Sequence, residues 1–113
     1  MKKFMVLYQS NETAVERMVK ATPEEMKKNM EPWLQWAEKC GDKLVDMGKP
    51  LGNGKKLTKS GTGESTSNSN GYSILQANDI NEAVSLLSSH PYLNVEEGAA
   101  IEVFEMLPIP GMD

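Results

Sequence analysis

His90 is the only histidine in the 113 residues, and it lies in the segment Ser-Ser-His-Pro-Tyr-Leu, residues 88–93. A histidine can act as a general base near neutral pH because its ordinary pKa is about 6.5. A base also needs an orienting partner, and Asp79 and Glu82 precede His90 by about two to three helical turns, which is too far. Because Pro91 follows, His90 equally predicts the end of a helix, where the macrodipole favours a cation. We therefore take His90 as the one candidate catalytic residue, with helix termination as the alternative.

Four aromatic side chains are candidates for the wall of a ligand-binding site. Tyr8 and Tyr92 each present an apolar ring with a polar tip, a common composition of small-molecule pockets. Trp33 and Trp36 are three residues apart, so they can flank one edge of a helix. The alternative for Trp33 and Trp36 is packing in the core or between two copies, and the alternative for Tyr8 and Tyr92 is a contact between two copies.

The sequence contains no recognisable metal-binding or cofactor-binding motif. Cys40 is the only cysteine, and one cysteine and one histidine without local ligand spacing make no metal site. Cys40 lies among apolar residues, which predicts a buried, unreactive thiol. The segment 52–54 (Gly-Asn-Gly) lacks the third glycine of a dinucleotide fingerprint, and 61–63 (Gly-Thr-Gly) lacks the Gly-Lys-Ser/Thr ending of a phosphate loop. We therefore expect no metal and no cofactor.

Charge and hydropathy exclude several classes of partner. The formal net charge is -4, from 12 basic and 16 acidic residues, and the basic residues are scattered, which argues against nucleic-acid binding. The opening apolar run, Phe4–Tyr8, is shorter than the roughly 7 to 15 residues of a signal peptide, and no run approaches the roughly 20 that span a bilayer. A single cysteine fits a reducing compartment. These features predict a soluble, cytoplasmic protein that binds neither nucleic acid nor membrane.

The pattern of elements predicts one domain, residues 1–113, with an α+β fold in the order β-α-β-β-α-β, the ferredoxin-like arrangement with an antiparallel sheet. In chain order we expect a strand over 2–9, a short helix over 14–20, a long helix from 23 to about 47, a short strand near 51–57, a mobile loop over 60–70, a strand over 71–77, a helix from 80 that Pro91 stops, and a strand over 99–107. The Gly- and Ser-rich stretch 58–70 is also a candidate lid.

The long helix has clear start and stop signals. Thr22 with Glu25 forms a capping box, and Pro23 takes the first helical position, where its missing N–H costs nothing. Pro32 predicts a kink or a break near residue 31 because it removes one helical hydrogen bond. Gly48 is the expected end.

Both faces of the predicted sheet carry apolar residues. The run Phe4–Tyr8 loads both sides of the first strand, and the last strand places Ile101 and Val103 on one side and Phe104 and Met106 on the other. Two helices can cover only one face, and large apolar patches are uncommon on soluble monomers. A second copy is the simplest cover for the other face. We therefore expect a homodimer whose two sheets form a dimeric α/β barrel.

Seven segments together are similar to a known family and span nearly the whole chain in the family's order: 4–8, 21–26, 33–36, 44–52, 71–74, 90–93 and 101–111. By these the chain resembles the YCII-related, or DGPF-domain, family of dimeric α/β-barrel proteins. The segment 60–65 replaces the family's Asp-Gly-Pro-Phe signature, and the long helix lacks the histidine that some relatives use, so no catalytic residue carries over. Relatives in the wider superfamily include lactone isomerases and a dehydrochlorinase of chlorinated hydroquinones, which implies a small, fairly apolar ligand.

Two functions fit these observations. The first is a cytoplasmic homodimer that binds a small organic molecule in a cleft between sheet and helices, with or without cofactor-free, isomerase- or lyase-like proton transfer. The second is a non-catalytic interaction or regulatory module whose cleft is filled by side chains. An open cavity beside Tyr8, Trp36 and His90 favours the first function, and a sealed core there favours the second.

Overall fold

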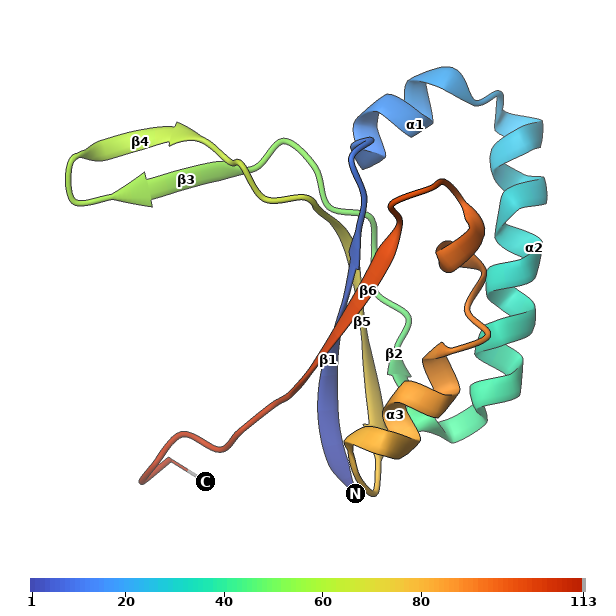
Figure 1. Cartoon of the computed structure of the whole chain (residues 1–113), viewed down its shortest axis with the longest axis vertical. Helices are drawn as coiled ribbons and strands as arrows, with labels where there is room; N and C mark the ends of the chain where they lie inside the picture. The colour runs from blue at the N-terminus through green and yellow to red at the C-terminus, as the bar shows by residue number, and fades with distance from the viewer. Residues whose placement is uncertain (113) are drawn as a thin grey trace.

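The computed structural model describes residues 1–112, which form a four-stranded sheet with three helices on one side (Figure 1). The elements are β1 (Lys2–Gln9), α1 (Ala14–Lys20), α2 (Pro23–Cys40), the 3-10 helix η1 (Gly41–Lys43), β2 (Leu44–Asp46), β3 (Lys55–Thr58), β4 (Gly61–Glu64), β5 (Ser69–Ala77), α3 (Ile80–Leu87), the 3-10 helix η2 (Pro91–Asn94) and β6 (Ala100–Glu105). The sheet order is β2-β5-β1-β6, and every neighbouring pair is antiparallel. This α+β arrangement is compatible with the predicted ferredoxin-like order, and the sheet is open.

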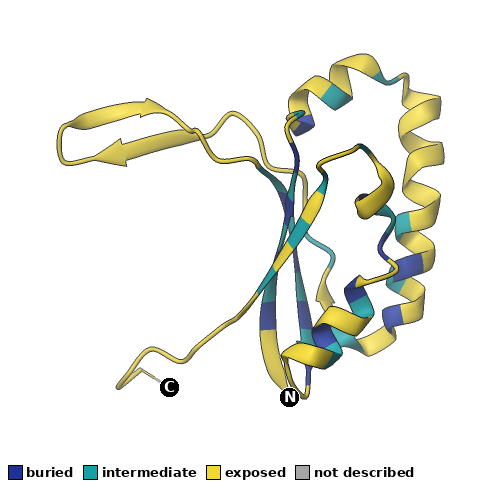
Figure 2. Cartoon of the chain, viewed as in Figure 1, coloured by how far each residue is buried: buried dark blue, intermediate teal, exposed yellow. Residues whose placement is uncertain are grey.

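The core lies between the sheet and the helices and is centred on β1. Phe4, Val6 and Tyr8 alternate along the strand, are almost fully buried and face the helices. Leu75 on the neighbouring β5 is buried with them, and Trp36 reaches the same cluster from α2. Figure 2 shows the buried residues gathered at this interface. Aromatic and β-branched residues thus explain both the strand and the core it supports.

The long helix begins as predicted but ends seven residues early. Thr22 accepts the amide of Glu25 and donates its own amide to the Glu25 carboxylate, so the capping box is confirmed. The helix runs through Pro32 without a break. Its predicted end near residue 47 is wrong, because Gly41, with a φ of 60°, terminates the helix at Cys40.

The second strand of the sheet is therefore β2, which the sequence analysis had assigned to the helix. Leu44 pairs with Leu75 of β5. The predicted strand near 51–57 and the predicted mobile loop over 60–70 are wrong in this form, since β3 and β4 pair into a separate two-stranded hairpin. Every residue of the hairpin is exposed, and it projects away from the helices (Figure 1).

Gly48 has a different role from the predicted end of a helix. It follows β2 with a φ of 77°, and a Cβ placed there would lie 1.7 Å from the carbonyl oxygen of Tyr72. Its amide donates to the Asp46 carboxylate at 2.8 Å, which closes the turn. Only glycine allows this close approach of the chain to β5.

The face of the sheet opposite the helices carries a row of apolar side chains. Met5 pairs with Ile74 on one side and with Phe104 on the other, so the row crosses β5, β1 and β6. Leu7 and Tyr72 form the next pair along the same face. Phe104 is 50% exposed, and nothing in residues 1–112 covers the row. The prediction that β1 is apolar on both faces is confirmed.

Candidate ligand-binding site

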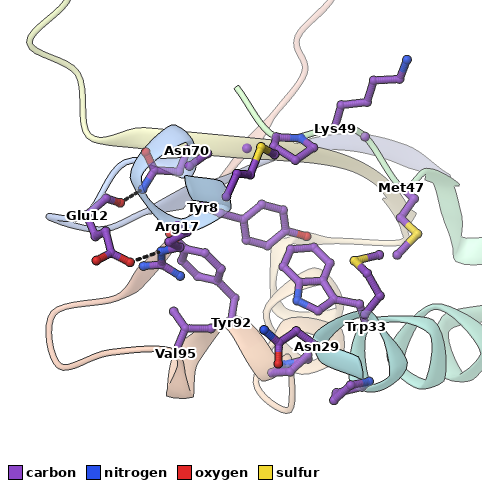
Figure 3. A pocket seen from close by; sticks show the side chains of 18 of the residues that line it. Tyr8, Glu12, Arg17, Asn29, Trp33, Met47, Lys49, Asn70, Tyr92 and Val95 are labelled. Atoms are coloured by element: carbon purple, nitrogen blue, oxygen red, sulfur yellow. Dashed lines mark hydrogen bonds and ion pairs between the residues drawn. The ribbon is translucent and has the colours of Figure 1, made fainter. Parts of the chain in front are cut away.

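A cavity of about 770 Å³ lies at one end of the sheet, below α1 and beside α2 and η2 (Figure 3). Tyr8 comes from the end of β1, Trp33 from α2 and Tyr92 from η2. The linker 47–50 after β2 and the start of β5 at 70–72 complete the wall. The cavity is thus built by five separate stretches of the chain, which only the folded sheet brings together.

Three aromatic rings form the inner wall of the cavity. The centroid of the Tyr8 ring lies 5.0 Å from that of Trp33 and 5.2 Å from that of Tyr92. The Trp33 and Tyr92 rings meet edge-on, with centroids 6.2 Å apart. Such tilted and edge-on contacts are favourable for aromatic rings and fix their orientation. The structure therefore places three of the four predicted ligand-binding residues at one cavity.

A chain of hydrogen bonds fixes the hydroxyl of Tyr8. The Ser73 hydroxyl donates to the carbonyl oxygen of Met47 at 2.7 Å. Because its single proton is used there, the 2.7 Å bond between Tyr8 and Ser73 has Tyr8 as the donor. Burial raises the pKa of Tyr8 to about 12, although the hydrogen bond to Ser73 opposes that shift. The ring therefore presents a neutral phenol to the cavity.

A polar network forms the outer wall. Arg17 donates to the Ser10 hydroxyl at 2.8 Å, and its Nε lies 3.4 Å from the Glu12 carboxylate. Asn70 donates to the Ser10 hydroxyl at 2.8 Å and to the Glu12 carbonyl at 2.6 Å. The Lys20 ammonium, bound to the Glu12 carboxylate, holds the pKa of that carboxyl below its usual value. The network ties the loop after β1 to α1 and to β5.

His90 lies behind the aromatic rings and not on the cavity surface. It is 1% exposed, and its ring centroid lies 4.3 Å from that of Trp33 and 4.3 Å from that of Trp36. Its Nδ1 accepts the Tyr92 amide at 2.9 Å, which places the proton of the neutral ring on Nε2. Burial lowers the pKa of His90 to about 4.

This geometry does not provide a catalytic base at His90. The lone pair of the ring is occupied by the Tyr92 amide, and Nε2 carries a proton without a hydrogen-bond partner in the described residues. His90 instead caps the start of η2, and α3 already ends at Leu87, so the predicted role of His90 as the end of that helix is wrong. The cation favoured by a helix macrodipole is absent, because the ring is buried and neutral.

Trp36 also lies away from the cavity. Its side chain is 3% exposed, and its Nε1 donates to the carbonyl oxygen of Leu86 at 2.8 Å. It therefore joins α2 to the end of α3. Cys40, one turn later, is buried as predicted, and burial raises the pKa of its thiol.

The sequence analysis missed the polar half of the site. Arg17, the only arginine in the chain, lies with its Cζ atom 5.4 Å from the centre of the Tyr92 ring, and Asn70 is 60 positions from its partner Ser10. A lone arginine on a short helix was the only available signal. In residues 1–112, no three His, Cys, Asp or Glu side chains gather as a metal site, and no helix has the length and apolar character to cross a membrane.

Comparisons of this chain with protein-family models, with curated proteins and with solved structures found no match. The resemblance to the YCII-related family stays a prediction.

Proposed function

We propose that this protein binds a small organic molecule in the cavity between β1, α1, α2 and η2. The observation that carries the proposal is a cavity of about 770 Å³ lined by the aromatic rings of Tyr8, Trp33 and Tyr92 and by polar side chains that include Arg17 and Asn70. This volume and composition are typical of small-molecule sites, which bury an apolar body and orient it with a few polar groups.

The Tyr92 hydroxyl supports the same proposal. It is buried and has no hydrogen-bond partner within residues 1–112, although its ring lines the cavity. Buried polar groups are nearly always paired in native proteins, and an unpaired one costs about 1 to 3 kcal/mol. A ligand that moves the overlying side chains slightly and reaches this hydroxyl would remove that cost.

The proposed activity is binding, without proton transfer at His90. His90 is separated from the cavity by Tyr8 and Trp33, and its only lone pair is bonded to a backbone amide. The alternative of a module with a filled cleft has no supporting observation, since side chains leave this volume open.

A ligand screen tests the proposal. The two tryptophans provide an internal comparison, since Trp33 lines the cavity and Trp36 lies behind it. We expect at least one member of a panel of lactones, phenols and organic acids to raise the melting temperature by several degrees, because a ligand at 100 times its Kd stabilises by about 2.7 kcal/mol. The same compound should shift the indole NMR signal of Trp33 more than that of Trp36. A panel that moves neither the melting temperature nor the Trp33 signal would contradict the proposal.

We also propose that the uncovered face of the sheet is the contact between two copies in a dimeric α/β barrel. The apolar row of Met5, Ile74 and Phe104 supports this, since it has no cover within one chain. The segment after β6 extends to the same side of the sheet (Figure 1), and it contains Leu107 and Ile109, which are 73% and 61% exposed. A two-fold axis through such a self-complementary face closes the assembly at two copies.

A further inference from the structure

The charges around the cavity are strongly biased toward one sign. Arg17, Lys20, Lys28 and Lys49 line it, which is a third of the 12 basic residues, whereas Glu12 is the only acidic residue within residues 1–112 that does. The whole chain has a formal net charge of -4, so the average surface would give the opposite bias. A cationic wall in an acidic protein concentrates anions locally.

Two of these cations have no carboxylate partner in the part of the chain that the structure describes. Glu12 is already paired with Arg17 and with Lys20. Arg17 has a second ion pair with Glu96, at 3.6 Å. Lys28 and Lys49 take part in none of the ion pairs in residues 1–112. In Figure 3 the Lys49 side chain extends from the edge of the cavity, on the far side of the Tyr8 ring from Arg17.

The cations favour a negatively charged ligand, and the aromatic inner wall of the cavity adds a second requirement on that ligand. Tyr8, Trp33 and Tyr92 offer apolar ring surface, and Tyr8 offers no free proton because it donates to Ser73. A bare inorganic anion would leave this surface in contact with water and gain nothing from it. The two walls together select a molecule with a flat apolar body at one end and a negative charge at the other.

We infer that the ligand of this cavity is a ring-bearing organic anion, with the ring against Tyr8, Trp33 and Tyr92 and the acid group at the rim beside Lys28 and Lys49. The inference rests on the proposed function and names the class of molecule that the site takes. The acid group is a carboxylate or a phosphate monoester, because both bear the charge that the two ammonium groups recognise.

Matched naphthalene probes test the inference with the full-length protein. Binding of 2-naphthoate, 2-naphthyl phosphate, the neutral 2-naphthamide and inorganic phosphate is measured by the shift of the Trp33 indole NMR signal, with Trp36 as the internal reference. We expect at least one naphthyl anion to bind about tenfold more tightly than the amide at low ionic strength, and the difference to shrink at high salt. The tighter of the two anions identifies the acid group.

Charge variants locate the effect. The double variant Lys28→Gln/Lys49→Gln should remove most of the anion preference, measured as the ratio of the naphthyl-anion affinity to the amide affinity in the same variant. The control is Lys27→Gln/Lys39→Gln, which removes the same number of charges from α2 at positions that do not line the cavity, and it should keep the preference. Both pairs alter exposed side chains, so folding should be retained.

The outcomes separate the two proposals. If the amide binds as tightly as both naphthyl anions, or if the control variant loses the preference equally, the anion inference is wrong while the binding site stands. Binding of inorganic phosphate as tight as that of naphthyl phosphate overturns the requirement for a ring. If none of the four compounds shifts Trp33, both the inference and the proposed site are contradicted.

Discussion

The imidazole of His90 is enclosed by the rings of Tyr8, Trp33 and Trp36, and it is held as a neutral acceptor for the Tyr92 amide. Such a group contributes to the fold through shape and one hydrogen bond. A charged ring at the same place would have to be desolvated without a nearby acid, which is why its pKa falls. His90 is the residue whose type best suits proton transfer at neutral pH, and it is also among the most deeply buried residues of this protein.

The buried state of His90 predicts a pH dependence of stability. Its pKa is about 4 in the folded protein and about 6.5 in the unfolded chain, so the unfolded state binds more protons between these values. The free energy of unfolding should fall as the pH drops from about 6.5 to about 4, by up to about 3 kcal/mol, and His90 should add no slope above that window. NMR titration of the single imidazole and urea unfolding at several pH values measure this.

The control for this prediction is His90→Asn, which keeps a side-chain acceptor for the Tyr92 amide and cannot titrate. It should lose most of the slope in the acid window. An imidazole that titrates close to pH 6.5 in the folded protein would show that the ring is solvated.

At the residue scale, aromatic composition singled out Tyr8, Trp33 and Tyr92, and the structure places all three at one cavity. Composition could not separate Trp33 from Trp36, which lie three residues apart on α2, because the depth of each ring depends on how the helix is rotated against the sheet. Nor could it predict Arg17 as a member of the wall, since its partners come from the loop before α1 and from the segment after η2.

The turn between β2 and the hairpin gives a prediction at the scale of the element. Gly48→Ala should destabilise the protein by about 2 to 4 kcal/mol, because the new Cβ meets the Tyr72 carbonyl and the backbone keeps a positive φ. Gly41→Ala is the matched control. It also has a positive φ, but its Cβ meets nothing within 4 Å, so we expect a cost of only about 1 to 2 kcal/mol. Urea unfolding compares the two, and equal costs would contradict the close approach to β5.

The sequence predicted correctly those elements whose structure is determined by residues close together in the chain. The Thr22 capping box and the alternation along β1 specify their elements within a few residues. β2 was not predicted, because a strand of three residues has too little hydrophobic pattern to recognise. It is a strand because it pairs with β5, about thirty positions away. Leu44 and Val45 also continue the helical spacing of α2, so they concealed the stop at Gly41.

At the scale of the whole molecule, the uncovered face predicts the state of association. Ile74→Glu places a charge in the apolar row, where pairing of two copies would bury it without a partner. We expect the unaltered protein to sediment as a dimer at micromolar concentration and this variant as a folded monomer. Gln35→Glu, which adds the same charge on the exposed side of α2, should stay dimeric. A monomeric unaltered protein would contradict the proposed barrel.

The β3–β4 hairpin has a consequence for how this chain can change over evolution or in the laboratory. Its strands pair only with each other, and none of their residues enters the core or the cavity wall. Lengthening, trimming or replacing the stretch between residues 55 and 64 should therefore leave the register of the sheet untouched. The hairpin is therefore a site that tolerates insertion, at which a new recognition element can be added without changing the rest of the protein.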